Sequence, residues 1–178
     1  SPSSAASDVY KRQVYDTNNI LVDQSVLSTE VIKEPVNKKV VEGTKKVTSS
    51  TKYITGSGQF IWPVPNYKYV SRWMGNGHRG ADICAAYGTP ILASDSGTII
   101  AAGWHYSYGN YVEIDHGNGY KTLYAHMCRY VVQAGQTVEK GQLIGYVGAT
   151  GAATGNHCHF EMYYNNALIS ARNVFPDI

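Results

Sequence analysis

Short apolar runs punctuated by glycine dominate the chain from residue 59 onward. Runs such as GTPILAS, GTIIAAGW, NYVEIDH, GYKTLYAHM and GQLIGYVG are rich in β-branched and aromatic residues. This pattern is typical of short β-strands joined by tight turns. The DHGNGYK segment has the composition of a hairpin turn. Because no helical period is evident, we predict an all-β fold for residues 59–178, a compact barrel or sandwich of short antiparallel strands.

A second alternating segment, residues 14–47, precedes this region. SVLSTEVIKEPV predicts a strand that is interrupted at Pro35, and KKVVEGTKK predicts a second strand that ends at a glycine turn. Serine, threonine and glycine are frequent in VTSSTKYITGSG, so we expect residues 48–58 to form a linker. The pattern therefore predicts a small strand-rich N-terminal extension that a linker joins to the larger domain.

The first residues do not fit either pattern. SPSSAASDVYKRQ has no initiator methionine and no alternation, and its DVYKRQ resembles the translation of a transposase adaptor used in library preparation. We therefore interpret residues 1–13 as an adaptor-derived segment and expect the natural protein to continue upstream. The lack of a signal peptide in this sequence then says nothing about localisation.

Composition narrows the possible functions only slightly. The hydrophobic fraction of 43% and the charged fraction of 16% are ordinary for a soluble domain, and a net charge of +2 is too small to favour nucleic acid. No apolar run is long enough for a transmembrane helix. Cys84, Cys128 and Cys158 follow no CxxC spacing, which argues against a zinc ribbon or a disulfide framework.

Candidate chemistry lies at three places near the borders of predicted strands. HRGAD contains His78 and Asp82, in what we expect to be a loop that enters a strand. LYAHM ends a strand run with His126, and HCH contains His157 and His159. Each is weak evidence alone, because HxxxD occurs often by chance and a lone histidine is usually structural.

Strand geometry sharpens the interpretation of TGNHCHFEM. Alternate side chains of a strand share a face, so His157, His159 and Glu161 are expected to point one way and Cys158 the other. A hydrolytic zinc centre needs three protein ligands, an open position for water and nearby acid–base groups. Two of the four histidines and Asp82 would supply the three ligands, and the other two histidines would supply the acid–base groups. Spacing does not decide which histidine of HCH would bind a metal.

The combination of motifs resembles a known family. HRGADICAAYGTPILASDSGTIIAAGW, GNYVEIDHGNGYKTLYAHM, GQTVEKGQLIGYVGATG and TGNHCHFEM are similar to segments of the lysostaphin-like (LytM-type) zinc metallopeptidases that cut peptidoglycan peptides. The resemblance covers about two thirds of the chain. It implies a duplicated-hybrid-like β fold, one zinc ion, and a secreted, cell-wall-associated endopeptidase that acts on bacterial peptidoglycan.

The same resemblance assigns roles residue by residue. It implies that His78, Asp82 and His159 are zinc ligands, and that His126 and His157 are catalytic partners that handle protons or stabilise the oxyanion. Which histidine acts as the general base stays open. Cys158 stands where the family usually has an aliphatic residue, and we interpret it as a small apolar core residue.

The N-terminal extension carries a resemblance of its own. EVIKEPVNKKVVEGTKK is similar to the C-terminal half of the five-glycine surface module found beside bacterial wall hydrolases. Residues 14–47 are therefore expected to be a partial module of this type.

Other functions fit fewer of these features. A catalytically inactive relative, serving as a wall-binding scaffold or hydrolase activator, would be expected to have lost site residues. A lipoyl-type carrier needs an exposed lysine in a tight turn, a setting we do not expect for Lys121 or Lys140, and it leaves the histidines unexplained. A wall-binding module alone would account only for the N-terminal extension.

Overall fold

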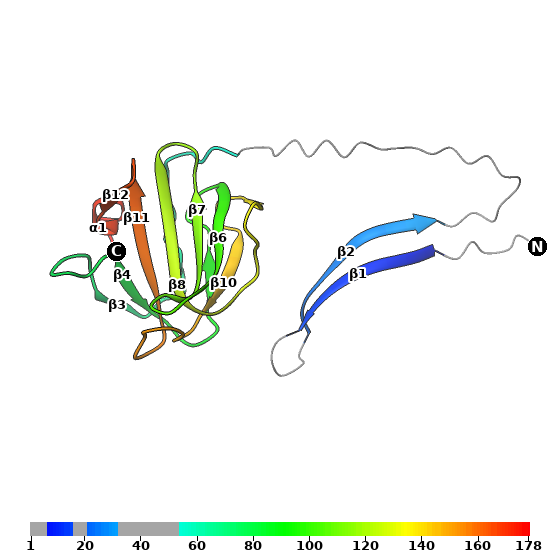
Figure 1. Cartoon of the computed structure of the whole chain (residues 1–178), viewed down its shortest axis with the longest axis horizontal. Coiled ribbons are helices and arrows are strands. Elements are labelled where there is room, and N and C mark those ends of the chain that lie inside the picture. The colour runs from blue at the N-terminus through cyan, green and yellow to red at the C-terminus, as the bar shows by residue number, and fades with distance from the viewer. Residues whose placement is uncertain (1–6, 16–20, 32–53) are drawn as a thin grey trace, which may run out of the picture. The chain divides into compact units, whose positions relative to one another are not determined.

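The computed structural model describes residues 7–15, 21–31 and 54–178, and the chain divides into two units, Ser1–Thr48 and Ser49–Ile178. In the first unit β1 (Ser7–Tyr15) pairs with β2 (Leu21–Val31) as an antiparallel hairpin (Figure 1). β2 overlaps the predicted strand in SVLSTEVIKEPV. KKVVEGTKK lies outside the described residues, so the five-glycine module and the boundaries at residues 13 and 47 stay predictions.

The second unit is built on one ten-stranded sheet with the path β3-β4-β11-β8-β7-β6-β9. β10 pairs with β5 and β8, and β12 pairs with β11, all in antiparallel register. The strands are β3 (Tyr69–Arg72), β4 (Ala81–Cys84), β5 (Pro90–Leu92), β6 (Gly97–His105), β7 (Gly109–Asp115), β8 (Tyr120–Tyr130), β9 (Thr137–Val138), β10 (Leu143–Val147), β11 (His157–Tyr164) and β12 (Ala167–Ile169). The predicted all-β, antiparallel class is confirmed.

Alternation along β11 separates the core from the candidate site. Cys158, Phe160 and Met162 are fully buried in a core cluster to which β4, β6, β7, β8 and β10 also contribute. Burying a side chain such as Phe160 contributes roughly 2–3 kcal/mol. The interpretation of Cys158 as a core residue is confirmed. Cys158 pairs with Ile83 rather than Cys84 across the β4–β11 ladder, and all three cysteines are free.

Two local features depart from the sequence interpretation. The chain contains a short helix, α1 (Ala171–Val174), near its end, where we expected none. A single turn is too short to show a 3.6-residue period. Lys140 is exposed in the turn between β9 and β10, contrary to our expectation, but its Nζ atom donates to Ser57 Oγ and the Gln59 carbonyl. Among the described residues, no helix has the length and hydropathy to cross a membrane.

Candidate metal and catalytic site

Register between β4, β11 and β8 brings the predicted site residues together. In this sheet His159 on β11 lies opposite Asp82 on β4, and on its other side opposite Ala125, the neighbour of His126 on β8. His78 ends a tight turn in which Gly75 and His78 exchange backbone hydrogen bonds, and β4 begins shortly afterwards at Ala81. Segments separated by about half of the chain therefore meet at one point.

Gly80 permits this meeting. A Cβ atom at Gly80 would collide with the backbone carbonyl of Phe160 and would approach the Glu161 side chain to 3.2 Å. The backbone of HRGAD can thus lie directly against β11 only because residue 80 has no side chain. The sequence interpretation of this glycine as a loop residue missed its steric role.

We expect Gly80→Ala to separate HRGAD from β11. The substitution should lower the free energy of unfolding by about 1–3 kcal/mol, because the clash is with backbone that cannot rotate away. It should also weaken zinc binding, which calorimetric titration would measure beside urea denaturation. Gly103→Ala is the matched control, since a Cβ there has no neighbour within 4 Å and residue 103 does not line the cleft. Wild-type zinc affinity in Gly80→Ala would contradict the steric role.

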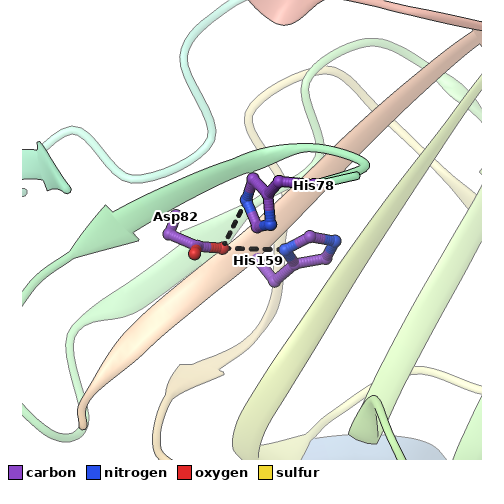
Figure 2. A group of neighbouring side chains, drawn as sticks. All are labelled: His78, Asp82 and His159. Atoms are coloured by element: carbon purple, nitrogen blue, oxygen red, sulfur yellow. Dashed lines mark hydrogen bonds and ion pairs between the residues drawn. The ribbon is translucent and has the colours of Figure 1, made fainter. Parts of the chain in front are cut away.

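Three possible ligand atoms converge in the space between these segments (Figure 2). Asp82 Oδ1 lies 3.1 Å from His78 Nε2 and 2.8 Å from His159 Nδ1, and the ligand atoms of the three residues all lie within 4.8 Å of one another. The two imidazole rings meet edge to face, with centroids 5.0 Å apart. The arrangement combines two nitrogen donors and one carboxylate, a set that zinc commonly takes.

His78 gives an independent sign of a missing partner. Its Nε2 atom is buried and makes no hydrogen bond, although Asp82 Oδ1 lies 3.1 Å away. Ligand atoms of a tetrahedral zinc site lie about 3.3–3.6 Å apart, slightly more than the Asp82 distances. A small outward movement of these side chains would therefore fit the ion, and the residues present suit zinc.

Electrostatics favour the metal-binding protonation state of Asp82 and His78 but not that of His159. Burial alone raises the pKa of the Asp82 carboxyl, but the hydrogen bond from His159 and the neighbouring imidazoles lower it below its usual range. Burial lowers the pKa of His78 despite the attraction of Asp82, so its lone pair is available near neutral pH. Burial also disfavours protonation of His159, yet hydrogen bonds to Asp82 and Glu161 raise its pKa to about 9. A proton and a cation therefore compete for His159 Nδ1.

His126 reaches the same cleft through an irregularity in β8. Asn110 pairs with Met127 and Val112 with Tyr124, so two residues of β8 oppose one residue of β7. His126 has a φ of 59°, in the left-handed region that few residues with side chains adopt. This β-bulge turns His126 toward the cleft, where its ring lies 5.9 Å from that of His159.

The protonation pattern of His126 and His157 follows from their hydrogen bonds. His126 Nδ1 lies 2.8 Å from the Thr150 carbonyl, and His157 Nδ1 lies 2.8 Å from the Gly155 carbonyl. A carbonyl only accepts, so each Nδ1 carries the proton and each neutral ring keeps a lone pair on Nε2. His157 Nε2 lies 3.6 Å from Asp82 Oδ1. The ring centroids of His126 and His157 lie 4.7 Å apart. Burial lowers the pKa of His126, which favours its neutral form.

The site lies in an open cleft of about 690 Å³, which all five predicted residues line. Arg72 also lines it, whereas Trp73 packs beside Trp62 and beneath the guanidinium of Arg172. Sequence reasoning assigned no role to Glu161 and Arg79, two charged groups behind His159. For Glu161 a signal existed, because it shares the strand face of His157 and His159.

The two remaining histidines have structural partners. His116 is fully buried, with Nδ1 2.8 Å from the Ser96 carbonyl and Nε2 2.9 Å from Thr122 Oγ1. His105 Nδ1 accepts hydrogen bonds from the backbone N–H groups of Ser107 and Tyr108 and so holds the turn between β6 and β7.

Known peptidases are similar to this chain in sequence. Residues 76–171 match Peptidase family M23. The chain is 42% identical over 97 residues to the peptidoglycan DD-endopeptidase ShyC of Vibrio cholerae. It is 43% identical over 97 residues to the DD-carboxypeptidase/endopeptidase Mpg of Neisseria meningitidis. Each alignment covers 54% of this chain but only 22% of the relative, so the chain spans about a fifth of the length of these curated relatives.

Solved structures of peptidases are also similar to this chain. A zinc-containing peptidase from Vibrio cholerae superimposes with a TM-score of 0.61 and 33% identity, over 64% of this chain and 39% of the other. The catalytic domain of the antimicrobial peptidase lysostaphin from Staphylococcus simulans superimposes with a TM-score of 0.56 and 31% identity, over 64% of this chain and 96% of that domain.

Proposed function

Because the chain belongs to peptidase family M23, we propose that it is a zinc-dependent endopeptidase that hydrolyses peptide bonds in bacterial peptidoglycan. The observation that carries the proposal is the convergence of His78, Asp82 and His159 beside two further imidazoles. The names of similar proteins, a peptidoglycan DD-endopeptidase among them, support the substrate class.

In this proposal His78, Asp82 and His159 hold one zinc ion. When bound, zinc acts as a Lewis acid that polarises a carbonyl group and lowers the pKa of water. The protein contributes the fixed geometry: His78 and His159 offer nitrogen lone pairs, and Asp82 offers the negative charge that offsets part of the charge of the ion. The open cleft leaves room for a peptide to lie across the three donors.

His126 and His157 supply the acid–base chemistry. The Nε2 atom of each ring can accept a proton from the water molecule that attacks the scissile carbonyl, while the Nδ1–H group stays bonded to a backbone carbonyl. The resulting imidazolium can donate a hydrogen bond to the developing oxyanion or return the proton to the leaving amine. Two neighbouring imidazoles can divide these tasks.

An inactive relative that acts as a scaffold or hydrolase activator is the competing function. Loss of a ligand or of an acid–base group would favour it, but all five expected residues are present around the cleft. Similar proteins that act on peptidoglycan do so outside the cytoplasm, where the substrate lies. We propose that this protein is likewise secreted and associated with the cell wall.

The test is digestion of purified peptidoglycan by the zinc-loaded chain, followed by mass spectrometry of the released fragments. One sample should carry direct cross-links between stem peptides and another glycine bridges, so that one experiment tests activity and bond specificity. We expect new peptide amino termini with intact glycan strands, loss of cleavage on adding a chelator, and recovery on adding zinc. Full activity in metal-stripped protein, or cleavage confined to glycan, would refute the proposal.

A further inference from the structure

Glu161 is a fully buried carboxylate directly behind His159. An ionised carboxylate is costly to bury unless several donors satisfy it. Four donors converge on Glu161. Its Oε1 atom accepts from Arg79 Nε at 3.2 Å, the Tyr108 hydroxyl at 2.9 Å and His159 Nε2 at 3.0 Å, and its Oε2 atom accepts from the Tyr163 hydroxyl. These bonds fix the carboxylate in one orientation.

The donors come from separate parts of the fold and also support one another. Arg79 precedes β4, and its Nη2 atom donates a hydrogen bond to the Tyr163 hydroxyl at 2.8 Å. Tyr108 lies between β6 and β7, and its ring is nearly parallel to that of His159, with centroids 6.1 Å apart. Together they enclose the side of His159 that faces away from Asp82.

The direction of the bond between Glu161 and His159 decides which nitrogen of His159 is free. Both oxygens of Glu161 already accept hydrogen bonds from other groups, Oε1 from Arg79 and Tyr108 and Oε2 from Tyr163, so Glu161 faces His159 as an acceptor. His159 Nε2 must therefore carry the proton. In the neutral ring the lone pair is then on Nδ1, the atom that lies 2.8 Å from Asp82 Oδ1.

We propose that Glu161 is a positioning residue for the metal site, because by accepting the Nε2 proton of His159 it fixes the tautomer and ring orientation that leave Nδ1 free to bind zinc. Arg79, Tyr108 and Tyr163 hold Glu161 for this task. The inference rests on the proposed ligand role of His159. Glu161 would not itself be a ligand, since it is not part of the group formed by His78, Asp82 and His159.

Zinc affinity measured without substrate tests the proposal. Glu161→Gln keeps the size of the side chain but removes the charge and brings an N–H₂ group among donors. We expect zinc to bind about 10- to 100-fold more weakly, the usual effect of removing a group that orients a metal-binding histidine. Competition with a chromophoric chelator would give the affinity, and the visible spectrum of the cobalt-substituted protein would show the altered ligand geometry.

Glu113→Gln is the matched control. Glu113 on β7 and Glu161 on β11 both lie opposite Leu123 of β8, so the same substitution is made in the same row of the sheet. We expect wild-type zinc affinity and an unchanged cobalt spectrum for this variant. Equal weakening in both variants would indicate a general loss of structure and overturn the proposal.

Two further variants keep the test decisive if Glu161→Gln does not fold. Tyr108→Phe and Tyr163→Phe each remove one donor to Glu161 while preserving the ring, and each should weaken zinc binding by a smaller factor. Wild-type affinity in both tyrosine variants, or in folded Glu161→Gln, would overturn the positioning role. His159→Ala sets the reference for a lost ligand, and wild-type affinity there would overturn the premise. None of these results depends on which bond the enzyme cleaves.

Discussion

Replacement of His159 by alanine is expected to abolish zinc binding and peptidase activity together. His159 Nδ1 and His78 Nε2 are the two nitrogen atoms of the proposed site, and each lies close to Asp82 Oδ1. Losing one of the three ligands leaves two, fewer than the three protein ligands that a catalytic zinc site uses. The loss in affinity should exceed the about 10- to 100-fold typical of groups behind a ligand. Metal content of the purified variant and peptidoglycan cleavage would be measured on the same sample.

Equivalent losses are expected for His78→Ala and Asp82→Ala, since each removes one of the same three donors. Glu139→Gln is the control for the change of charge, because this carboxylate is exposed near the turn after β9 and does not line the cleft. The ligand set would be wrong if any of the three alanine variants kept wild-type zinc content and activity. The acid–base roles of His126 and His157 would not be affected by that result.

The second large effect is expected for His126→Asn, which should reduce turnover by about 10²- to 10⁴-fold, the usual contribution of a general acid–base group. Zinc content should stay at one ion per chain, because His126 lies beside the ligand set rather than within it. Stability should change by less than about 1 kcal/mol, since asparagine tolerates the left-handed backbone conformation that His126 adopts with φ of 59°. Turnover, metal analysis and thermal unfolding would separate the three quantities.

His157→Gln and the double variant extend this experiment. If His126 and His157 act on the same proton transfer, the double variant should be little slower than the slower single variant. If they act in separate steps, the two losses should multiply. Turnover of His126→Asn within a few-fold of wild type would show that His126 is structural, as its bond to the Thr150 carbonyl alone would permit.

Local sequence was sufficient for the fold class and for part of the site. Glycine-bounded runs of β-branched and aromatic residues predicted the antiparallel strands, because such residues fit a pleated, half-buried surface whatever lies beside them. The two-residue repeat of a strand likewise predicted that His157 and His159 share one face and that Cys158 belongs to the core. The short helix α1 was missed, since one turn shows no period.

Only the tertiary structure decided how these side chains meet. Strict alternation would place His126 on the same face as Tyr124, in the core, but the bulge in β8 turns it to the cleft. The register of β4 against β11 puts Asp82 opposite His159 rather than His157, and the distant Arg79 and Tyr108 complete the surroundings of Glu161. Alternation is a property of each strand alone, whereas bulges and register arise from pairing between strands. The candidate residues could therefore be proposed from the sequence, but their geometry could not.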